Sequence, residues 1–190
     1  MSSLPQHAAE VSGRHLAVAL PRRWRHVQAV AAKAHRLGAL VPDDAEVLAA
    51  AAWLHDIGYA PTIINTGFHS LDGARWLLRE GFSPRIAGLV AYHSCAAYEA
   101  EERGLGDALA AEFPKEESPT ADALWFADMT TGPDGQDFTA KERLAEIRER
   151  YGPEDLVTHF WREAEPALMD AIRRTQDRIL AQPMYGSFRG

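Results

Sequence analysis

The sequence contains little of what would mark a secreted, membrane-bound or nucleic-acid-binding protein. Its single cysteine, Cys95, cannot form an internal disulfide, so a reducing cytoplasm is the expected compartment. The first residues, MSSLPQHAAEVSGRH, include no apolar run long enough for a signal peptide or a membrane span. Basic residues do not outnumber acidic ones, because 20 Lys and Arg face 27 Asp and Glu and the formal net charge is -7. This balance argues against a broad binding surface for long nucleic acids or anionic membranes.

Strand signals are also missing, because no segment alternates apolar and polar residues over several positions. The composition, with 46% hydrophobic and 25% charged residues, is that of an ordinary globular protein, and 190 residues suit one domain. We therefore expect an all-α bundle of about seven helices, with residues 21–190 as one domain after a flexible N-terminal segment, 1–20. The helical segments are expected at residues 22–40, 43–58, 69–82, 85–104, 120–131, 139–152 and 153–182.

The dipeptide His55-Asp56 is the first candidate for chemistry. On its own it is weak evidence, since His and Asp are frequent enough in this chain to meet by chance. Its position is more informative, because it follows the apolar segment AEVLAAAAWL, where the interior-facing pattern predicts Leu or Ala. Two buried polar side chains need a partner, and a divalent cation would serve both.

Three further histidines and an aspartate stand out from their surroundings. His26 lies among apolar residues expected to face the core, whereas His35 lies roughly 180° around the same helix and is expected to face solvent. His93 falls in the apolar run LVAYHSCA, Asp128 falls in ALWFADM, and His69 opens a helical segment. A carboxylate or an imidazole in such a setting would be strongly desolvated without a partner.

Each of these residues has a plainer explanation when it is taken alone. A single buried histidine is more often a hydrogen-bonded core residue than a metal ligand. The argument for a metal therefore depends on the set, whose members are all nitrogen or carboxylate donors that suit iron, manganese, cobalt or zinc. The set is His26, His55, Asp56, His69, His93 and Asp128. The remaining histidines, His7, His15, His35 and His159, lack this setting, and Cys95 is expected to be a small core residue.

The order His26, His55-Asp56, Asp128 resembles the HD superfamily, a group of helical metal-dependent phosphohydrolases named after the dipeptide. The phrase WLHDIGYA is especially similar. The resemblance covers about residues 22–131 and implies an all-α core in which these four residues hold a metal ion. Residues 139–182 would then form additional C-terminal helices.

A second part of the resemblance concerns two-metal members, such as the cyclic-dinucleotide phosphodiesterases with an HD-GYP motif. The segments HSLDGARWLL and IAGLVAYHS are similar to the region in which those members add two histidines. This implies that His69 and His93 hold a second metal and that Asp56 bridges the pair. The cofactor would be one or two divalent metal ions. Iron or manganese is expected first, and cobalt, zinc, magnesium or nickel also fit these donors.

One position departs from the superfamily pattern. Many members continue the motif as HDIGK, with a lysine thought to meet the substrate, but Tyr59 stands there in this sequence. A tyrosine donates a hydrogen bond but brings no positive charge, so the role of the lysine does not transfer directly. Arg25 is a candidate for a phosphate contact, as are Arg22, Arg23 and Arg75, although arginines on helices are usually solvated.

The resemblance implies a phosphohydrolase that cleaves a small phosphate monoester or diester, such as a nucleotide, with a metal-activated water. His55 and Asp56 would be the catalytic residues. Two alternatives stay open. Some proteins with the same six ligands are mixed-valent di-iron oxygenases acting on inositol or phosphonates, and the inositol-cleaving kind uses the lysine that Tyr59 replaces. The other alternative is a non-catalytic helical module that keeps a metal for stability. The expected partner is a small phosphorylated molecule or another small anion, and the oligomeric state is left open.

Overall fold

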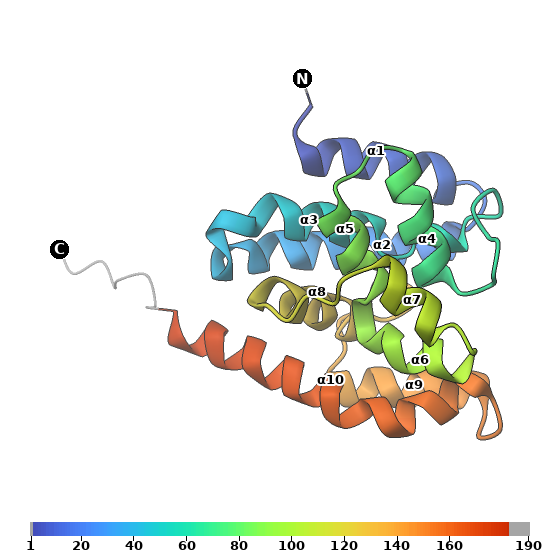
Figure 1. The fold of residues 1–190 in the computed structure, drawn as a ribbon. Helices are drawn as coiled ribbons and strands as arrows, with labels where there is room; N and C mark the ends of the chain where they lie inside the picture. The colour runs from blue at the N-terminus through green and yellow to red at the C-terminus, as the bar shows by residue number, and fades with distance from the viewer. Residues whose placement is uncertain (1, 183–190) are drawn as a thin grey trace.

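A computed structural model describes residues 2–182, and within this range the protein is a single all-α domain without strands (Figure 1). The α-helices are α1 (Leu4–Leu16), α2 (Pro21–Leu37), α3 (Ala45–Leu54), α4 (His69–Arg79), α5 (Pro84–Ala91), α6 (Ala96–Glu102), α7 (Gly106–Glu112), α8 (Pro119–Met129), α9 (Ala140–Tyr151) and α10 (Leu156–Ala181). Four short 3-10 helices are η1 (Gly38–Leu40), η2 (Pro42–Asp44), η3 (Ile57–Tyr59) and η4 (His93–Cys95). The predicted fold class is confirmed.

The helices are stacked from α1 at one end to α9 and α10 at the other (Figure 1). The short apolar helix α3 packs against both α1 and α2, and its alanines let these neighbours approach closely. Next in the stack, α8 contacts α2 and α3 on one side and α10 on the other. The core is fully buried at positions such as Leu48, Leu54 and Leu124. Helices α2, α3 and α8 therefore pack on one another between α1 and α10, which favours a rigid site among them.

The N-terminal segment does not match the prediction, because residues 4–16 form helix α1 where a flexible segment was expected. Ser3 caps the helix and forms a reciprocal capping box with Gln6. The buried face of the helix carries Ala8, Val11 and Leu16, which are spaced to form one apolar stripe. Small residues and a polar overall composition concealed this stripe in the sequence, and burial against α3 provides the stability that propensity alone does not.

The helix expected at residues 85–104 is divided in two. Helix α5 ends at Ala91, and the chain then passes through Ser94 and Cys95, whose φ angles are 47° and 64°. Consecutive residues with positive φ that are not glycine are unusual, and such backbone costs energy unless the surroundings enforce it. Neither residue type predicts a break, which explains why the sequence pattern suggested a continuous helix. A further short helix, α7, was not expected from the sequence.

The long C-terminal helix α10 is fixed to α8 by one carboxylate. Asp122 accepts two hydrogen bonds from Arg174, at 2.9 and 2.6 Å, and a third from Arg178, at 2.8 Å. Burial raises the pKa of Asp122, but these hydrogen bonds outweigh that effect and hold the pKa below its usual value. The ionised carboxylate therefore stabilises the docked position of α10.

Replacing Asp122 with asparagine should lower the free energy of unfolding at pH 7 by about 1 kcal/mol, a modest loss because both arginines are partly exposed. Since the folded-state pKa lies below the unfolded-state value of about 3.9, this stabilisation is present above that pH and fades as the pH falls further. Urea denaturation at pH 7 and pH 3 checks this expectation. The matched control is Asp170→Asn, because that exposed carboxylate and its partner Arg173 lie on α10 alone. An equal loss in both variants would contradict the docking role of Asp122.

None of the helices within residues 2–182 has both the length and the apolar composition needed to cross a membrane.

Candidate metal centre

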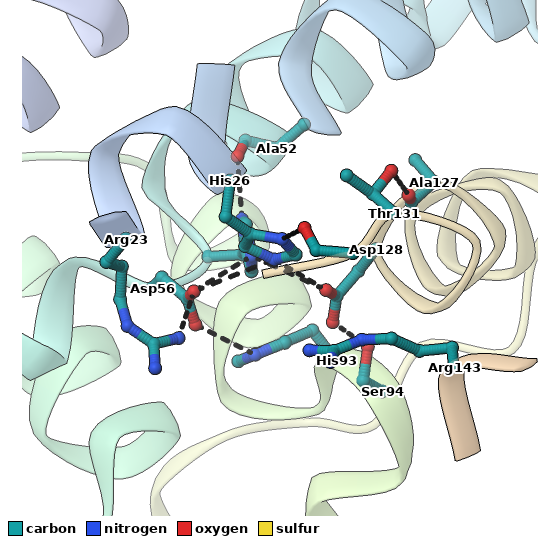
Figure 2. A network of polar contacts seen from close by, with 12 residues as sticks. Arg23, His26, Ala52, Asp56, His93, Ser94, Ala127, Asp128, Thr131 and Arg143 are labelled. Carbon is teal, nitrogen blue, oxygen red and sulfur yellow. Dashed lines mark hydrogen bonds and ion pairs between the residues drawn. The ribbon is translucent and has the colours of Figure 1, made fainter. Parts of the chain in front are cut away.

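The six side chains singled out in the sequence meet at one place in the fold, although they come from six separate elements. Figure 2 shows four of them, namely His26, Asp56, His93 and Asp128. His26 lies on α2, His55 caps the C-terminus of α3, and Asp56 follows it at the start of η3. The remaining three residues are His69, the first residue of α4, His93, the first residue of η4, and Asp128, in the last turn of α8. Five of the six are buried, and His69 is partly exposed.

The first group of donors lies around one oxygen of Asp56. The Nε2 atom of His55 is 3.4 Å from Asp56 Oδ2 and 3.8 Å from Asp128 Oδ1. The Nε2 atom of His26 is 3.0 Å from Asp128 Oδ1 and 3.9 Å from Asp56 Oδ2. Two imidazole nitrogens and two carboxylate oxygens thus face a common point, which is the donor set expected for a divalent transition metal.

The second group lies around the other oxygen of the same carboxylate. The Nε2 atoms of His69 and His93 are 3.7 and 3.9 Å from Asp56 Oδ1, and they are 3.2 Å from each other. Asp56 therefore faces His26 and His55 with Oδ2 and faces His69 and His93 with Oδ1. A carboxylate in this position could bridge two cations, as the sequence resemblance implied.

Backbone carbonyls fix the orientation of three of the imidazole rings. His26 Nδ1 is 3.0 Å from the carbonyl of Gly132, His55 Nδ1 is 2.8 Å from that of Ala52, and His93 Nδ1 is 2.6 Å from that of Val90. Each carbonyl accepts the Nδ1 proton, so Nε2 points into the cluster and carries the lone pair whenever the ring is neutral. This is the support that metal-ligating histidines usually have.

The electrostatics of the cluster keep its carboxylates ionised. Burial raises the pKa of Asp56, but Arg23 and His55 outweigh burial and hold it well below the usual range. The pKa of Asp128 is also lowered, against the effect of burial, by the hydrogen bond with His26 and the charge of His55. Burial and the neighbouring imidazoles lower the pKa values of His69 and His93, so both rings are neutral at pH 7. Ionised carboxylates and neutral imidazoles are the protonation states in which these groups bind cations.

His55 provides the clearest test of whether a cation fits. Its Nε2 atom is fully buried, and none of the described residues forms a hydrogen bond with it. A buried polar atom without a partner costs free energy, so it calls for a partner that is not among these side chains. Burial lowers the pKa of His55, yet Asp56 and Asp128 more than compensate and raise the pKa to about 9. The carboxylates around Nε2 thus stabilise a positive charge, and the donors present fit a divalent metal ion.

Two loops hold the histidines in place. Residues 130–137 fold back on α2, where Lys33 donates hydrogen bonds to the carbonyl and the hydroxyl of Thr130 and pairs with Asp137. This brings the Gly132 carbonyl to His26. The loop before α4 is held by Asp72, which accepts hydrogen bonds from the backbone N–H groups of residues 65, 66 and 67. That loop leads directly into His69. No pattern in the sequence predicts these supports.

A glycine allows α4 to reach the centre. A Cβ atom at Gly58 would lie 1.9 Å from the backbone oxygen of His69 and 2.7 Å from the backbone nitrogen of Gly73. Both contacts involve main-chain atoms, which cannot move aside independently. The glycine two residues after Asp56 therefore has a structural reason, because it lets the backbone of α4 pack directly on η3.

A cavity of about 190 Å³ opens onto the cluster, and it is lined by five of the six donors together with Arg23 and Tyr59. Arg23 donates a 2.6 Å hydrogen bond to Asp56 Oδ2 and lies 3.6 Å above the Tyr59 ring. Tyr59 in turn stacks on His69 with 4.0 Å between ring centroids. Of the two residues suggested for substrate contact, Tyr59 thus borders the centre. Arg25 does not, since it is exposed and pairs with Asp134.

The remaining histidines and Cys95 lie outside the cluster, as the sequence predicted. His7, His35 and His159 are exposed, and His15 is half-buried beside Trp76, away from the cluster. Cys95 is buried and free. The structure adds Ser94, whose hydroxyl donates to the Oδ2 atom of Asp128 and leaves Oδ1 facing the histidines. The positive φ angle of Ser94 places its hydroxyl in this contact, and no sequence pattern predicts this backbone conformation.

The sequence of this chain is similar to those of known proteins. A curated protein that matches part of the chain is the tRNA (cytidine(56)-2'-O)-methyltransferase of Picrophilus torridus, 37% identical over 78 residues. The match covers 41% of this chain and 22% of the methyltransferase, so the chain spans less than a quarter of that relative. No solved structure gives a significant match. The family model described as HD domain matches residues 23–129, which is more than half of the chain and includes all six clustered donors, and the protein therefore belongs to the HD domain family.

Proposed function

We propose that this protein is a metal-dependent phosphohydrolase that cleaves a small phosphate monoester or diester. The observation that carries the proposal is the convergence of His26, His55, Asp56, His69, His93 and Asp128 on one cluster beside the cavity, with Asp56 between the two groups of donors. Divalent ions bound there would polarise a phosphate oxygen and lower the pKa of a bound water toward neutrality.

The lining of the cavity supports an anionic substrate. Arg23, Arg103, Arg143 and Arg150 all border it, although the whole chain carries a formal net charge of -7. Positive side chains concentrated in one concave site attract an anion even when the rest of the protein repels it. Arginine also matches the oxygen geometry of phosphate groups through paired N–H donors.

The remaining side chains have definite tasks in this proposal. Arg23 lies next to Asp56 and offers a charge to an incoming phosphate oxygen. Burial raises the pKa of Tyr59, so its hydroxyl stays protonated at neutral pH and is available as a donor. Ser94 orients Asp128, and the Gly132 carbonyl orients His26. Tyr59 thus takes the place of the lysine of many HD proteins, while Arg23 supplies positive charge nearby.

The proposal is tested by removing metal with a chelator and restoring manganese, iron, cobalt or zinc separately. Hydrolysis of a panel of esters, followed as released phosphate for monoesters and as released alcohol for diesters, should be lost on chelation and return with at least one metal. His35→Ala, an exposed histidine on α2, should behave as the parent protein does. Oxygen uptake with iron and no phosphate release would favour the di-iron oxygenase. Absence of activity with every metal would favour the non-catalytic module.

A further inference from the structure

Arg143 is unusual among the arginines that border the cavity. Its side chain is 9% exposed, and its Nε atom is fully buried without a hydrogen-bond partner among the described residues. It lies on α9 (Ala140–Tyr151), outside the part of the chain that matches the HD domain. A buried guanidinium with a free donor is costly unless a ligand completes its hydrogen bonds.

The charges around Arg143 are not balanced. Arg143 and Arg150 both pair with the single carboxylate of Glu146, whereas Arg103 has Glu99 and Arg23 has Asp56. The two arginines of α9 therefore carry one positive charge more than the carboxylate they share, while Asp128, which also lines the cavity, belongs to the cluster of donors. Figure 2 shows the Arg143 side chain pointing toward His93, Ser94 and Asp128, with Arg23 on the opposite side of the cluster.

A second cavity of about 330 Å³ adjoins the first. The two share Arg23, His26, Arg143 and Arg150, so these residues lie at the junction. The rest of the second cavity is formed mainly by Ala19, Leu20, Pro21 and Pro133, which suit the less polar body of a small molecule. His26 is the one clustered donor that borders it, which places the second cavity beside the centre rather than within it.

We propose that Arg143 binds a second, non-reacting anionic group of the substrate at the junction of the two cavities, with Arg150 beside it. The substrate class is then a small molecule with at least two anionic groups. This inference rests on the proposed function for the identity of the reacting group, which Arg23 and the metal centre would receive. Glu146 holds Arg143 and Arg150 when no ligand is present and competes with the anion.

The test is a calorimetric titration of the full-length protein after dialysis against a chelator, so that metal affinity of the probes does not enter. The probes are inorganic phosphate, with one anionic group, and methylenediphosphonate and phosphonoacetate, with two. Arg143→Gln should weaken binding of a two-group probe about tenfold or more and change phosphate binding much less. The affinities of methylenediphosphonate and phosphonoacetate are then compared, which shows whether Arg143 prefers a phosphate-like group or a carboxylate.

Two further variants separate binding from folding. Glu146→Gln should tighten binding of the two-group probe, because it frees both arginines, and a purely structural role for Arg143 would not produce this gain. Arg148→Gln is the matched control, since Arg148 lies on the same helix, pairs with Glu165 and borders neither cavity. Equal losses for phosphate and the two-group probes in Arg143→Gln, or no gain in Glu146→Gln, would overturn the inference. The titration measures anion binding without metal, so its result is independent of the activity assay. The two-group probes can fail to bind at Arg143 although phosphate release depends on metal, and they can bind there although no phosphate is released.

Discussion

Replacement of Asp56 with alanine should remove both of the metal ions proposed for this centre and reduce the proposed phosphate release by about 100-fold or more. The reason is geometric, since Oδ2 faces His26 and His55 while Oδ1 faces His69 and His93. Loss of one carboxylate therefore takes a donor from each group. It also leaves Arg23 without its partner in a buried site, which adds repulsion to any incoming cation.

The measurement is the metal content per chain after reconstitution, together with the rate of phosphate release. His69→Ala gives the informative contrast, because it removes a donor from the second group alone and should leave one ion bound. His35→Ala lies on the same helix as His26 but faces solvent and should keep both ions. Retention of two ions by Asp56→Ala would show that Asp56 does not connect the groups. Far-ultraviolet circular dichroism checks that each variant is folded.

Replacement of Gly58 with alanine should destabilise the protein by about 3 kcal/mol or more. The added Cβ would lie 1.9 Å from the His69 carbonyl oxygen and 2.7 Å from the Gly73 nitrogen, so α4 and η3 would have to separate. His69 is the first residue of α4, and the displacement would carry it away from Asp56. We therefore expect a lower urea midpoint and weaker binding of the second metal ion in the same variant.

A second glycine provides the matched control. Gly13 lies inside α1, and a Cβ there would meet the Trp24 ring at 3.4 Å, which is an ordinary contact. Gly13→Ala should leave stability unchanged or raise it by up to about 1 kcal/mol, because alanine favours the helix. If the two variants lose stability equally, close packing of α4 on η3 is not what requires Gly58.

The fold class and the donor set could be predicted because both depend on patterns along the chain. Apolar spacing and capping residues revealed seven helical segments, and polar residues in apolar surroundings revealed the cluster. His93 and Asp128 were recognisable because an isolated imidazole or carboxylate in a buried apolar run needs polar partners from elsewhere in the fold. Helix α1 was missed because its few buried apolar residues stand in a mostly polar segment, and its stability comes from contact with α3.

Contacts between distant segments could not be predicted in the same way. The sequence offered several arginines near the histidines, and it favoured Arg25 over Arg23 although they are only two residues apart. On α2 this separation turns Arg25 away from the cluster, where Asp134 binds it, while Arg23 faces Asp56. Arg143 carries no signal at all in the sequence, because its importance depends on how α9 packs beside the centre.

The two groups of donors have different origins in the fold. The first is presented by α2, the end of α3 and α8, which support one another in the middle of the stack. His69 and His93 instead depend on the junction at Gly58 and on the short break after α5. Substitutions around His69 and His93 could remove the second of the proposed ions and leave the framework of the first group intact. A single lineage with this architecture could thus change its chemistry without first losing its fold.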